Sequence, residues 1–281
     1  MPKRTVRVFV SVPVAELRRR PSHASELVTQ AVLGETLTIT ARAPDRKWLR
    51  AIRWDGYRGW VRSWSVTRPS AAVLKAWDSD LPVQVGTRSA QVLAAPHSSA
   101  TLVCELALGT RLPGLTRRGR WVETALPEGR TGWLTRSQLV AVPTAPSSPA
   151  DVLKVARQFA GAPYLWGGIT PWGCDCSGFV QTVFRCCGVP LPRDACDQLR
   201  ALRAEVLGSS TGPFRPADLL FFGTSRKGVS HVAISTGGLR LLHAYGYVRE
   251  GNLEDGRPDS VADLAGLLRV AARPLGRRKK D

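Results

Sequence analysis

The feature that most constrains the fold is an internal repeat in the first half of the chain. The segment PSHASELV at 21–28 aligns with PHSSATLV at 96–103, at an offset of 75 residues. In each copy a tryptophan is followed twelve residues later by a second one within a Gly-Trp pair: Trp48 and Trp60 in the first, Trp121 and Trp133 in the second. We therefore expect the first 143 residues to contain two copies of the same fold.

Each copy reads as short alternating strands separated by Gly, Pro and polar turns. This pattern is typical of a small β-barrel of about 60–70 residues, and we expect its tryptophans to fill the core. Two copies are too few for a solenoid. We therefore predict two small all-β domains at 1–67 and 82–143, joined by a connecting segment at 68–81.

A Pro/Ser-rich linker at 144–149 precedes a third domain, 150–281. Ser148, Pro149 and Asp151 form a helix start of the N-cap, first-turn proline and acid type. Apolar residues at helical spacing predict a second helix from about Cys176 to Cys187. Strand-like runs follow at 218–223, 231–236 and 239–246. Helices followed by antiparallel strands predict an α+β domain.

The chain has six cysteines, and their spacing argues against both disulfides and metal ligation: Cys104, Cys174, Cys176, Cys186, Cys187 and Cys196. Adjacent and near-adjacent cysteines have poor geometry for disulfides, and a chain of this length does not need them. The last five could in principle hold a metal, but they lack the paired C-x₂-C spacing of structural zinc sites. We expect free thiols, no metal and no cofactor.

Cys176 is the candidate nucleophile. It begins the second predicted helix, where unpaired N–H groups and the helix dipole favour a thiolate. Asp175 is placed as the N-cap, and Ser177 and Gly178 are small enough for a substrate backbone to approach. Cys174 lies in the preceding turn and gains no such stabilisation. A cysteine at a helix start is more commonly a small core residue, so this hypothesis needs a base nearby.

The chain has four histidines from which that base can come. His23 and His97 occupy polar turns of the repeats and are expected at the surface, whereas His231 and His243 lie in the third domain with Cys176. The segment Thr236-Gly237-Gly238 is a hairpin signal. A turn centred on Gly237 places the last two histidines directly opposite each other on neighbouring strands. His231 is then the general base and His243 the residue that orients it.

Six motifs now resemble a known family: YLWGG (164–168), DCSGFV (175–180), GVPLPRDACDQ (188–198), RPADLLFF (215–222), SHVAI (230–234) and LLHA (241–244). In this order they resemble the NlpC family of papain-like bacterial cell-wall cysteine peptidases. The repeats at 1–143 resemble, more loosely, bacterial SH3-like domains. The resemblance implies two small all-β SH3-like barrels followed by an α+β papain-like cysteine peptidase domain.

The resemblance also implies an activity, hydrolysis of the γ-D-glutamyl–diamino-acid bond of peptidoglycan stem peptides. It places the nucleophile on Cys176, the base on His231 and the third polar residue on His243. Tyr164 would assist at the oxyanion together with the backbone N–H of Cys176.

One subgroup of this family resembles the whole chain: two SH3-like domains, then the peptidase, without an export signal. Its members act on wall peptides with a free N-terminal L-Ala, in cell-wall peptide recycling. The resemblance implies that Asp194, Tyr57 and Glu26 bind the substrate ammonium, while Asp175 and Ser177 line the site. The second repeat has EGRTGW where the first has DGYRGW, so it lacks this tyrosine and has a structural role.

The N-terminus and the charge decide between rival expectations. The first apolar segment is short, carries Arg7 and alternates like a strand, so we expect a strand, not a signal peptide, and a cytoplasmic protein. We expect no membrane insertion and no nucleic-acid partner, and the oligomeric state stays open.

The net charge of +18, with a basic run at 277–280, leaves an alternative: a non-catalytic basic protein that binds an anionic wall polymer. A papain-like amidase or acyl transferase is a further alternative.

Overall fold

The protein is described by a computed structural model at residues 6–78, 82–207, 212–225 and 228–275. The basic run at 277–280 therefore lies outside the described residues. The chain divides into two compact units, Met1–Val142 and Pro143–Asp281. In the described ranges, no helix is long and apolar enough to span a membrane.

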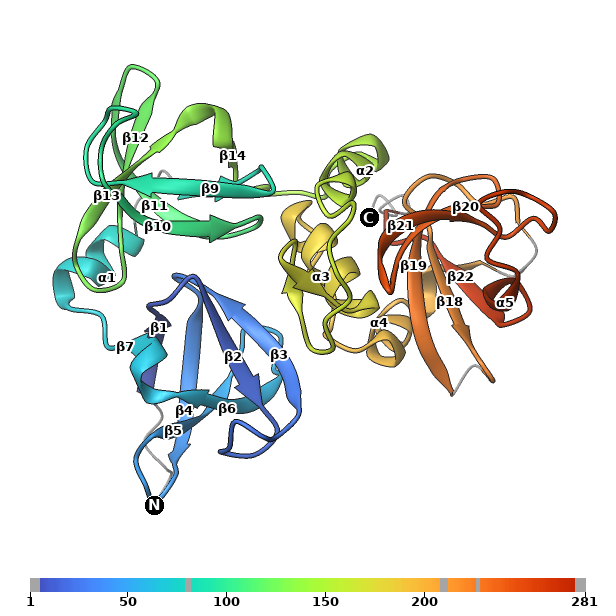
Figure 1. Ribbon diagram of the computed structural model, residues 1–281, viewed down its shortest axis with the longest axis horizontal. Coiled ribbons are helices and arrows are strands. Elements are labelled where there is room, and N and C mark those ends of the chain that lie inside the picture. The colour runs from blue at the N-terminus through green and yellow to red at the C-terminus, as the bar shows by residue number, and fades with distance from the viewer. Residues whose placement is uncertain (1–5, 79–81, 208–211, 226–227, 276–281) are drawn as a thin grey trace. The chain divides into compact units, whose positions relative to one another are not determined.

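The first unit contains two seven-stranded sheets, which Figure 1 shows in blue and in green. The strand orders are β3-β2-β6-β5-β4-β1-β7 and β10-β9-β13-β12-β11-β8-β14. The two orders are identical when seven is subtracted from each strand number of the second sheet, so that β8 corresponds to β1 and β14 to β7. The two sequence repeats therefore fold in the same way. The strands of the first sheet are Val6–Val10 (β1), Val14–Arg18 (β2), Leu27–Val32 (β3), Thr36–Arg42 (β4), Trp48–Ile52 (β5), Arg58–Arg62 (β6) and Val66–Thr67 (β7). Those of the second are Pro82–Val85 (β8), Ser89–Leu93 (β9), Leu102–Ala107 (β10), Arg111–Arg118 (β11), Trp121–Ala125 (β12), Thr131–Thr135 (β13) and Leu139–Ala141 (β14).

The main buried cluster of each sheet is aliphatic, and the tryptophans contribute a smaller part of the core than expected: Trp121 and Trp133 form a separate buried cluster with Leu93, and Trp48 is also buried. Val, Leu and Ala side chains make up the buried cluster of each sheet. Trp48 is buried at the margin of its sheet, where the guanidinium of Arg62 stacks on the indole at 5.1 Å. Arg118 stacks in the same way on Trp133 at 5.3 Å. The indoles therefore shield the edges of the cores and hold arginines on the surface.

The connecting segment contains a helix that the sequence analysis did not predict, α1 (Ala71–Trp77). Ser70 caps it, since its side chain accepts a hydrogen bond from the N–H of Val73. Trp77 packs on Phe9 of β1, with ring centroids 4.7 Å apart. The same indole packs against the core of the second sheet, so α1 joins the cores of both sheets.

The second unit begins with helices and continues into a sheet (Figure 1). Its six-stranded sheet has the order β17-β22-β18-β19-β20-β21, and every pairing is antiparallel. Ser148 caps the first helix in a capping box with Asp151, as predicted. The helices are Pro149–Arg157 (α2), Cys176–Cys186 (α3), Ala195–Ala201 (α4) and Ala262–Ala265 (α5). The strands are Ile169–Thr170 (β15), Gly173–Cys174 (β16), Val206–Leu207 (β17), Leu219–Gly223 (β18), Val229–Gly237 (β19), Arg240–Tyr245 (β20), Tyr247–Asn252 (β21) and Leu268–Ala272 (β22).

The helices and the sheet enclose the core that positions the site. α3 packs against β19 and β20, and α4 packs against β19. A second cluster joins β18, β19, β20 and β22 to the segment around α5 through Phe222, Ala233 and Leu264. Because side chains alternate along a strand, His231 shares a face of β19 with Ala233, the face that α5 covers.

Candidate active site

A buried ion pair fixes the start of α3, where the candidate nucleophile lies. Asp175 is the N-cap, as predicted, and its Oδ1 accepts the N–H of Gly178 at 2.7 Å. Its Oδ2 accepts the N–H of Gly167 at 2.8 Å. The guanidinium of Arg193, which is 2% exposed, spans both carboxylate oxygens and also donates to Ser177 Oγ at 2.9 Å. This carboxylate therefore ties the helix start to two loops.

Close backbone contact also locks the first turn of α3. A Cβ on Gly178 would lie 2.1 Å from the carbonyl oxygen of Gly168. A Cβ on Gly168 would in turn lie 2.4 Å from the carbonyl oxygen of Gly173. We expected Gly178 to leave room for substrate, but the space is filled by the protein's own backbone.

Cys176 lies in the first turn of α3, against the strand that carries His231. Its Sγ donates to the carbonyl oxygen of Ser230 at 3.9 Å, and the N–H of Val232 donates to the sulfur. The thiol thus spans the two residues that flank His231 on β19. Pairing between β19 and β20 begins only at Ile234, so the sulfur meets β19 where that ladder has ended.

Burial favours the neutral form of the Cys176 thiol and opposes the thiolate that the helix start was expected to stabilise. Burial raises its pKa to about 11, and the negative charge of Asp175 acts in the same direction. The N–H groups of Val232 and Ser177 and the charge of Arg193 oppose this effect but do not overcome it. The helix start orients the sulfur, while its low exposure, 6%, sets its protonation state.

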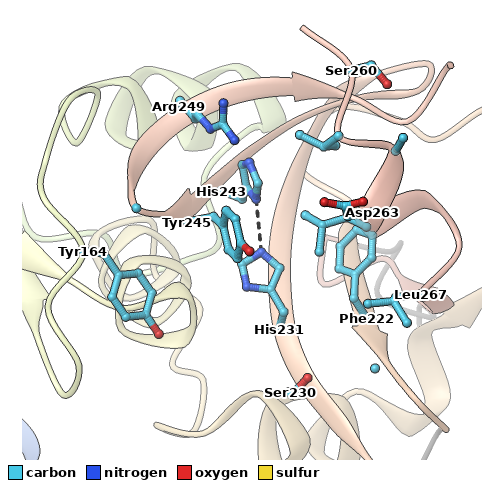
Figure 2. Close-up of a pocket in the computed structure, with 15 residues that line it drawn as sticks. Tyr164, Phe222, Ser230, His231, His243, Tyr245, Arg249, Ser260, Asp263 and Leu267 are labelled. Carbon is cyan, nitrogen blue, oxygen red and sulfur yellow. Dashed lines mark hydrogen bonds between the residues drawn. The ribbon is translucent and has the colours of Figure 1, made fainter. Parts of the chain in front are cut away.

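The two histidines of the second unit form a hydrogen-bonded pair. His231 Nε2 lies 3.2 Å from His243 Nδ1, and Figure 2 shows this contact as a dashed line. The predicted hairpin is present, but its register was wrong, because Ile234 pairs with Leu242 and Ser235 with Leu241. A bulge after Ser235 moves the turn past Gly237 and shifts the register by two residues. An even shift keeps both imidazoles on one face, so they meet diagonally.

Both imidazoles are neutral. Burial lowers the pKa of His231 to about 4. Burial, followed by the neighbouring His231 and Arg249, lowers the pKa of His243 to about 3. For His231 Nδ1 to accept a proton, Nε2 must carry a hydrogen and donate it to His243 Nδ1. In Figure 2 the Nδ1 of His231 points toward the side where Tyr164 lies.

Tyrosines flank the histidine pair. The N–H of Tyr164 donates to the carbonyl oxygen of Gly246 at 2.8 Å, and its backbone bridges to Cys174. Burial and the nearby Cys176 and Asp175 raise the pKa of its phenol to about 12, so it is a proton donor at neutral pH. Tyr245, which sequence reasoning did not single out, stacks parallel to His243 with ring centroids 6.1 Å apart.

The predicted substrate-binding residues of the second unit lie near one another. Asp175 and Ser177 are buried within the Arg193 network, so the structure joins them to the scaffold of the site. Asp194 directly follows Arg193 and begins α4, and its side chain does not cap that helix. It is half-buried, beside the residue that holds Asp175.

Tyr57 and Glu26 belong to the first unit. The loop that carries Tyr57 is built on a buried ion pair: Arg53 Nε donates to Glu35 Oε1 at 2.7 Å, with both side chains at most 2% exposed. Asp55 binds the same guanidinium at 3.2 Å and accepts the N–H of Tyr57 at 3.0 Å. The second repeat has Thr110, Leu126 and Glu128 at the corresponding positions, so this loop is specific to the first copy. Glu26 is exposed and pairs with Arg19.

All six cysteines are free thiols. Among the residues that the structure describes, no three His, Cys, Asp or Glu side chains are grouped so that they could hold a metal ion. What the site offers is a thiol, an imidazole held by a second imidazole, and a phenol. Such a set can support nucleophilic attack on a carbonyl.

Comparison with known families matches the part of the chain that carries this site. Residues 161–258 match the NlpC/P60 family, and residues 17–65 match the bacterial dipeptidyl-peptidase Sh3 domain. The second unit therefore contains an NlpC/P60 domain. Cys176, His231 and His243 all fall within the matched NlpC/P60 domain.

Named relatives extend over most of the chain. A γ-D-glutamyl-L-lysine dipeptidyl-peptidase of Bacillus cereus is 28% identical over 240 residues, covering 79% of this chain and 68% of the relative. Dipeptidyl-peptidase 6 of Lysinibacillus sphaericus is 27% identical over 271 residues, or 92% of this chain and 95% of the relative. The crystal structure of an NlpC/P60 family protein from Bacillus cereus has the same fold, with a TM-score of 0.81, 22% identity and coverage of 96% and 100%.

Sequence reasoning missed one central residue of the NlpC/P60 domain, Arg193. The signal was available, because Arg193 stands within the same PRDA segment that pointed to Asp194. An arginine that is nearly fully buried needs a carboxylate partner. Asp175 was instead assigned to the substrate and to the helix cap, which left no partner to propose for Arg193.

The raised pKa of Cys176 predicts that the resting NlpC/P60 domain holds no thiolate at neutral pH. Because the pKa is raised to about 11, the thiol stays protonated below that value and ionises only as the pH approaches it. Titration of ultraviolet thiolate absorbance, as the difference between wild type and Cys176→Ala, should show no signal at pH 7. A thiolate signal from Cys176 near neutral pH would instead indicate a preformed Cys–His ion pair.

Proposed function

We propose that this protein is a cysteine peptidase that hydrolyses the γ-D-glutamyl–diamino-acid bond of peptidoglycan stem peptides with a free N-terminal L-alanine. We further propose that it acts in the cytoplasm, in the recycling of cell-wall peptides. The names of the relatives from Bacillus cereus and Bacillus subtilis, γ-D-glutamyl-L-lysine dipeptidyl-peptidases, support this substrate class.

The observation that carries the proposal is the joint placement of Cys176, His231 and His243. The thiol contacts the backbone on both sides of His231, and the His231 imidazole is held by His243 at 3.2 Å. This combination of nucleophile, base and orienting group is the triad arrangement. A solely structural histidine pair would not require a thiol at the start of a helix beside it.

In the first step the Sγ of Cys176 attacks the γ-carbonyl carbon of the D-glutamyl residue. The S–H bond breaks, His231 Nδ1 takes the proton, and a C–S bond forms. Because the thiol has a pKa of about 11 and the imidazole one of about 4, the proton leaves sulfur only as that bond forms. His243 stabilises the imidazolium through the Nε2–H of His231.

The developing oxyanion needs hydrogen-bond donors. The phenol of Tyr164, which stays protonated because its pKa is raised to about 12, supplies one, and the backbone N–H of Cys176 supplies the other. When the tetrahedral intermediate collapses, the C–N bond breaks and His231 returns its proton to the leaving amine. A thioester of the L-Ala-D-Glu moiety remains on Cys176.

Water then releases the product. His231 Nδ1 takes a proton from the water as its oxygen attacks the thioester carbon. The C–S bond breaks, sulfur regains the proton from His231, and L-Ala-D-Glu leaves as the free acid. Every group in this proposed cycle belongs to the second unit, and no step uses a cofactor.

Asp194 is the proposed ligand of the substrate's terminal ammonium. Asp175 and Ser177 act by positioning Cys176, since their described contacts run to Arg193 and to the start of α3. The involvement of Tyr57 and Glu26, in the first unit, stays a prediction.

We also infer that the second seven-stranded sheet is a second SH3-like domain, and that the peptidase domain is an α+β domain of papain-like type. The matching strand order of the two sheets supports the first inference, although only residues 17–65 match the Sh3 domain. The proposed division is 1–67, a connecting segment at 68–81, 82–143, a linker at 144–149, and 150–281.

Replacement of the triad residues should separate their roles. Cys176→Ala should abolish hydrolysis of L-Ala-γ-D-Glu-L-Lys, and His231→Ala should lower kcat/KM by about a thousandfold or more, since it removes the general base. His243→Ala should be milder, because this residue exchanges no proton with the substrate. Release of L-Ala-D-Glu, followed by mass spectrometry, is the measurement. Cys174→Ala is the matched control, and loss of activity in Cys174→Ala with activity kept in Cys176→Ala would overturn the assignment.

Acetylation of the substrate's terminal amine should lower kcat/KM on the order of a hundredfold, because it removes a charge-assisted hydrogen bond to Asp194. Asp194→Asn should reduce the difference between the free and the acetylated peptide. Asp197→Asn is a matched control on the same helix, where this acid pairs with Arg200. Equal cleavage of both peptides by wild type would indicate an endopeptidase that does not require a free amino terminus.

A further inference from the structure

The pocket beside the histidines continues well past the reacting groups. It has a volume of about 670 Å³, within the range of sites for small molecules. Tyr164 and Ser230 line it at one end, and the segment that contains α5 lines it at the other. In Figure 2 the histidine pair lies between Tyr164 and this segment.

The direction of the pocket identifies the part of the substrate that it faces. His231 must hand its proton to the leaving amine, so the leaving residue lies on the His231 side of the sulfur. The part of the pocket beyond His231, toward β21 and α5, is therefore open to the diamino acid that leaves. The proposed catalytic cycle assigns no residue to this part.

Two charged side chains of opposite sign line this part of the pocket, Arg249 on β21 and Asp263 on α5. Figure 2 shows Arg249 on the Nε2 side of His243, and Asp263 on the wall to the other side of the imidazoles. Arg249 acts electrostatically on His243. Asp263 lies on α5, on the wall that also carries Leu264 and Leu267.

The guanidinium of Arg249 lies over the ring of Tyr247, 5.8 Å from its centroid, but among the residues that the structure describes one of its nitrogens has no hydrogen-bond partner. Its Nε is buried and makes no hydrogen bond within the described residues, and the same holds for Nε2 of His243. With His243 Nδ1 accepting from His231, this Nε2 carries a hydrogen, so both unpartnered atoms are donors. Both atoms lie below the pocket surface, so they favour negative charge nearby, and an anion in the pocket would contact the other guanidinium nitrogens of Arg249.

We infer that this part of the pocket binds the leaving diamino acid through both of its charges: Arg249 binds the free α-carboxylate and Asp263 binds the side-chain ammonium. The α-carboxylate is one carbon from the leaving nitrogen, which suits the cation that acts on His243. The ammonium is at the end of the side chain, which suits the acid across the pocket on α5. The enzyme is then selective for tripeptides that end at the diamino acid. This inference rests on the proposed function.

The test compares kcat/KM for four peptides on the full chain: L-Ala-γ-D-Glu-L-Lys, its C-terminal amide, its extension by D-Ala, and the analogue with norleucine in place of lysine. For wild type we expect the amide and the extended peptide to be slower by about tenfold or more. Norleucine should cost about two- to fivefold, because Asp263 is exposed.

The variants assign each preference to a residue. In Arg249→Gln the ratio between acid and amide should approach one, and Arg249→Lys should keep part of it. In Asp263→Asn the ratio between lysine and norleucine should approach one. Arg240→Gln and Asp255→Asn, outside the pocket lining, should keep the wild-type ratios. Each preference is measured as a ratio of kcat/KM values for two peptides on the same variant. Arg249 also acts on His243, and a change in His243 would alter kcat/KM for all peptides by the same factor.

Equal rates for acid and amide in wild type would overturn the inference while leaving the proposed function intact. A preference for a meso-diaminopimelate peptide that is lost in Arg249→Gln, with no preference for acid over amide, would also overturn it, since Arg249 would then bind the side chain. No cleavage of any of the peptides by wild type would instead count against the proposed function.

Discussion

At the start of α3 a buried carboxylate, Asp175, is held on both oxygens by the guanidinium of Arg193, and the geometry of the active site depends on this pair. The same carboxylate accepts the N–H groups of Gly167 and Gly178, and so joins the YLWGG and DCSGFV motifs. Loss of one partner would leave a buried charge uncompensated, at a cost of about 3–5 kcal/mol. The resulting disorder would affect the start of α3, the segment that holds the sulfur of Cys176 against β19.

Burial that fixes the nucleophile also determines its chemistry. The thiol and both imidazoles lie in an environment that disfavours charge, which raises the pKa of Cys176 to about 11 and lowers that of His231 to about 4. Burial therefore favours the neutral forms of both the thiol and the imidazole. In the proposed mechanism, charge develops as sulfur attacks the substrate carbonyl, where Tyr164 and the N–H of Cys176 would stabilise the oxyanion.

Local sequence rules predicted the elements that depend on local interactions. The Trp…Gly-Trp repeat predicted two copies of one fold, and Ser148 and Asp175 identified helix starts correctly. Features that depend on tertiary structure were missed or wrong. The bulge after Ser235, which shifts the register of the histidines, carries no sequence signal of its own, and the protonation of Cys176 depends on how deeply its helix start is buried. The partner of Arg193 was missed because Asp175 was assigned to the helix cap and the substrate, and the burial that requires the pair is a property of the tertiary structure.

The central claim is that Cys176 forms the covalent intermediate with the γ-D-glutamyl carbonyl. Acid quenching of the enzyme during turnover of L-Ala-γ-D-Glu-L-Lys, followed by mass spectrometry of the intact protein and of its proteolytic fragments, tests this directly. The account predicts an added L-Ala-D-Glu acyl group on the fragment that contains Cys176, absent from Cys176→Ala. An acyl group on Cys174 or on any other side chain, or turnover in Cys176→Ala, would contradict it.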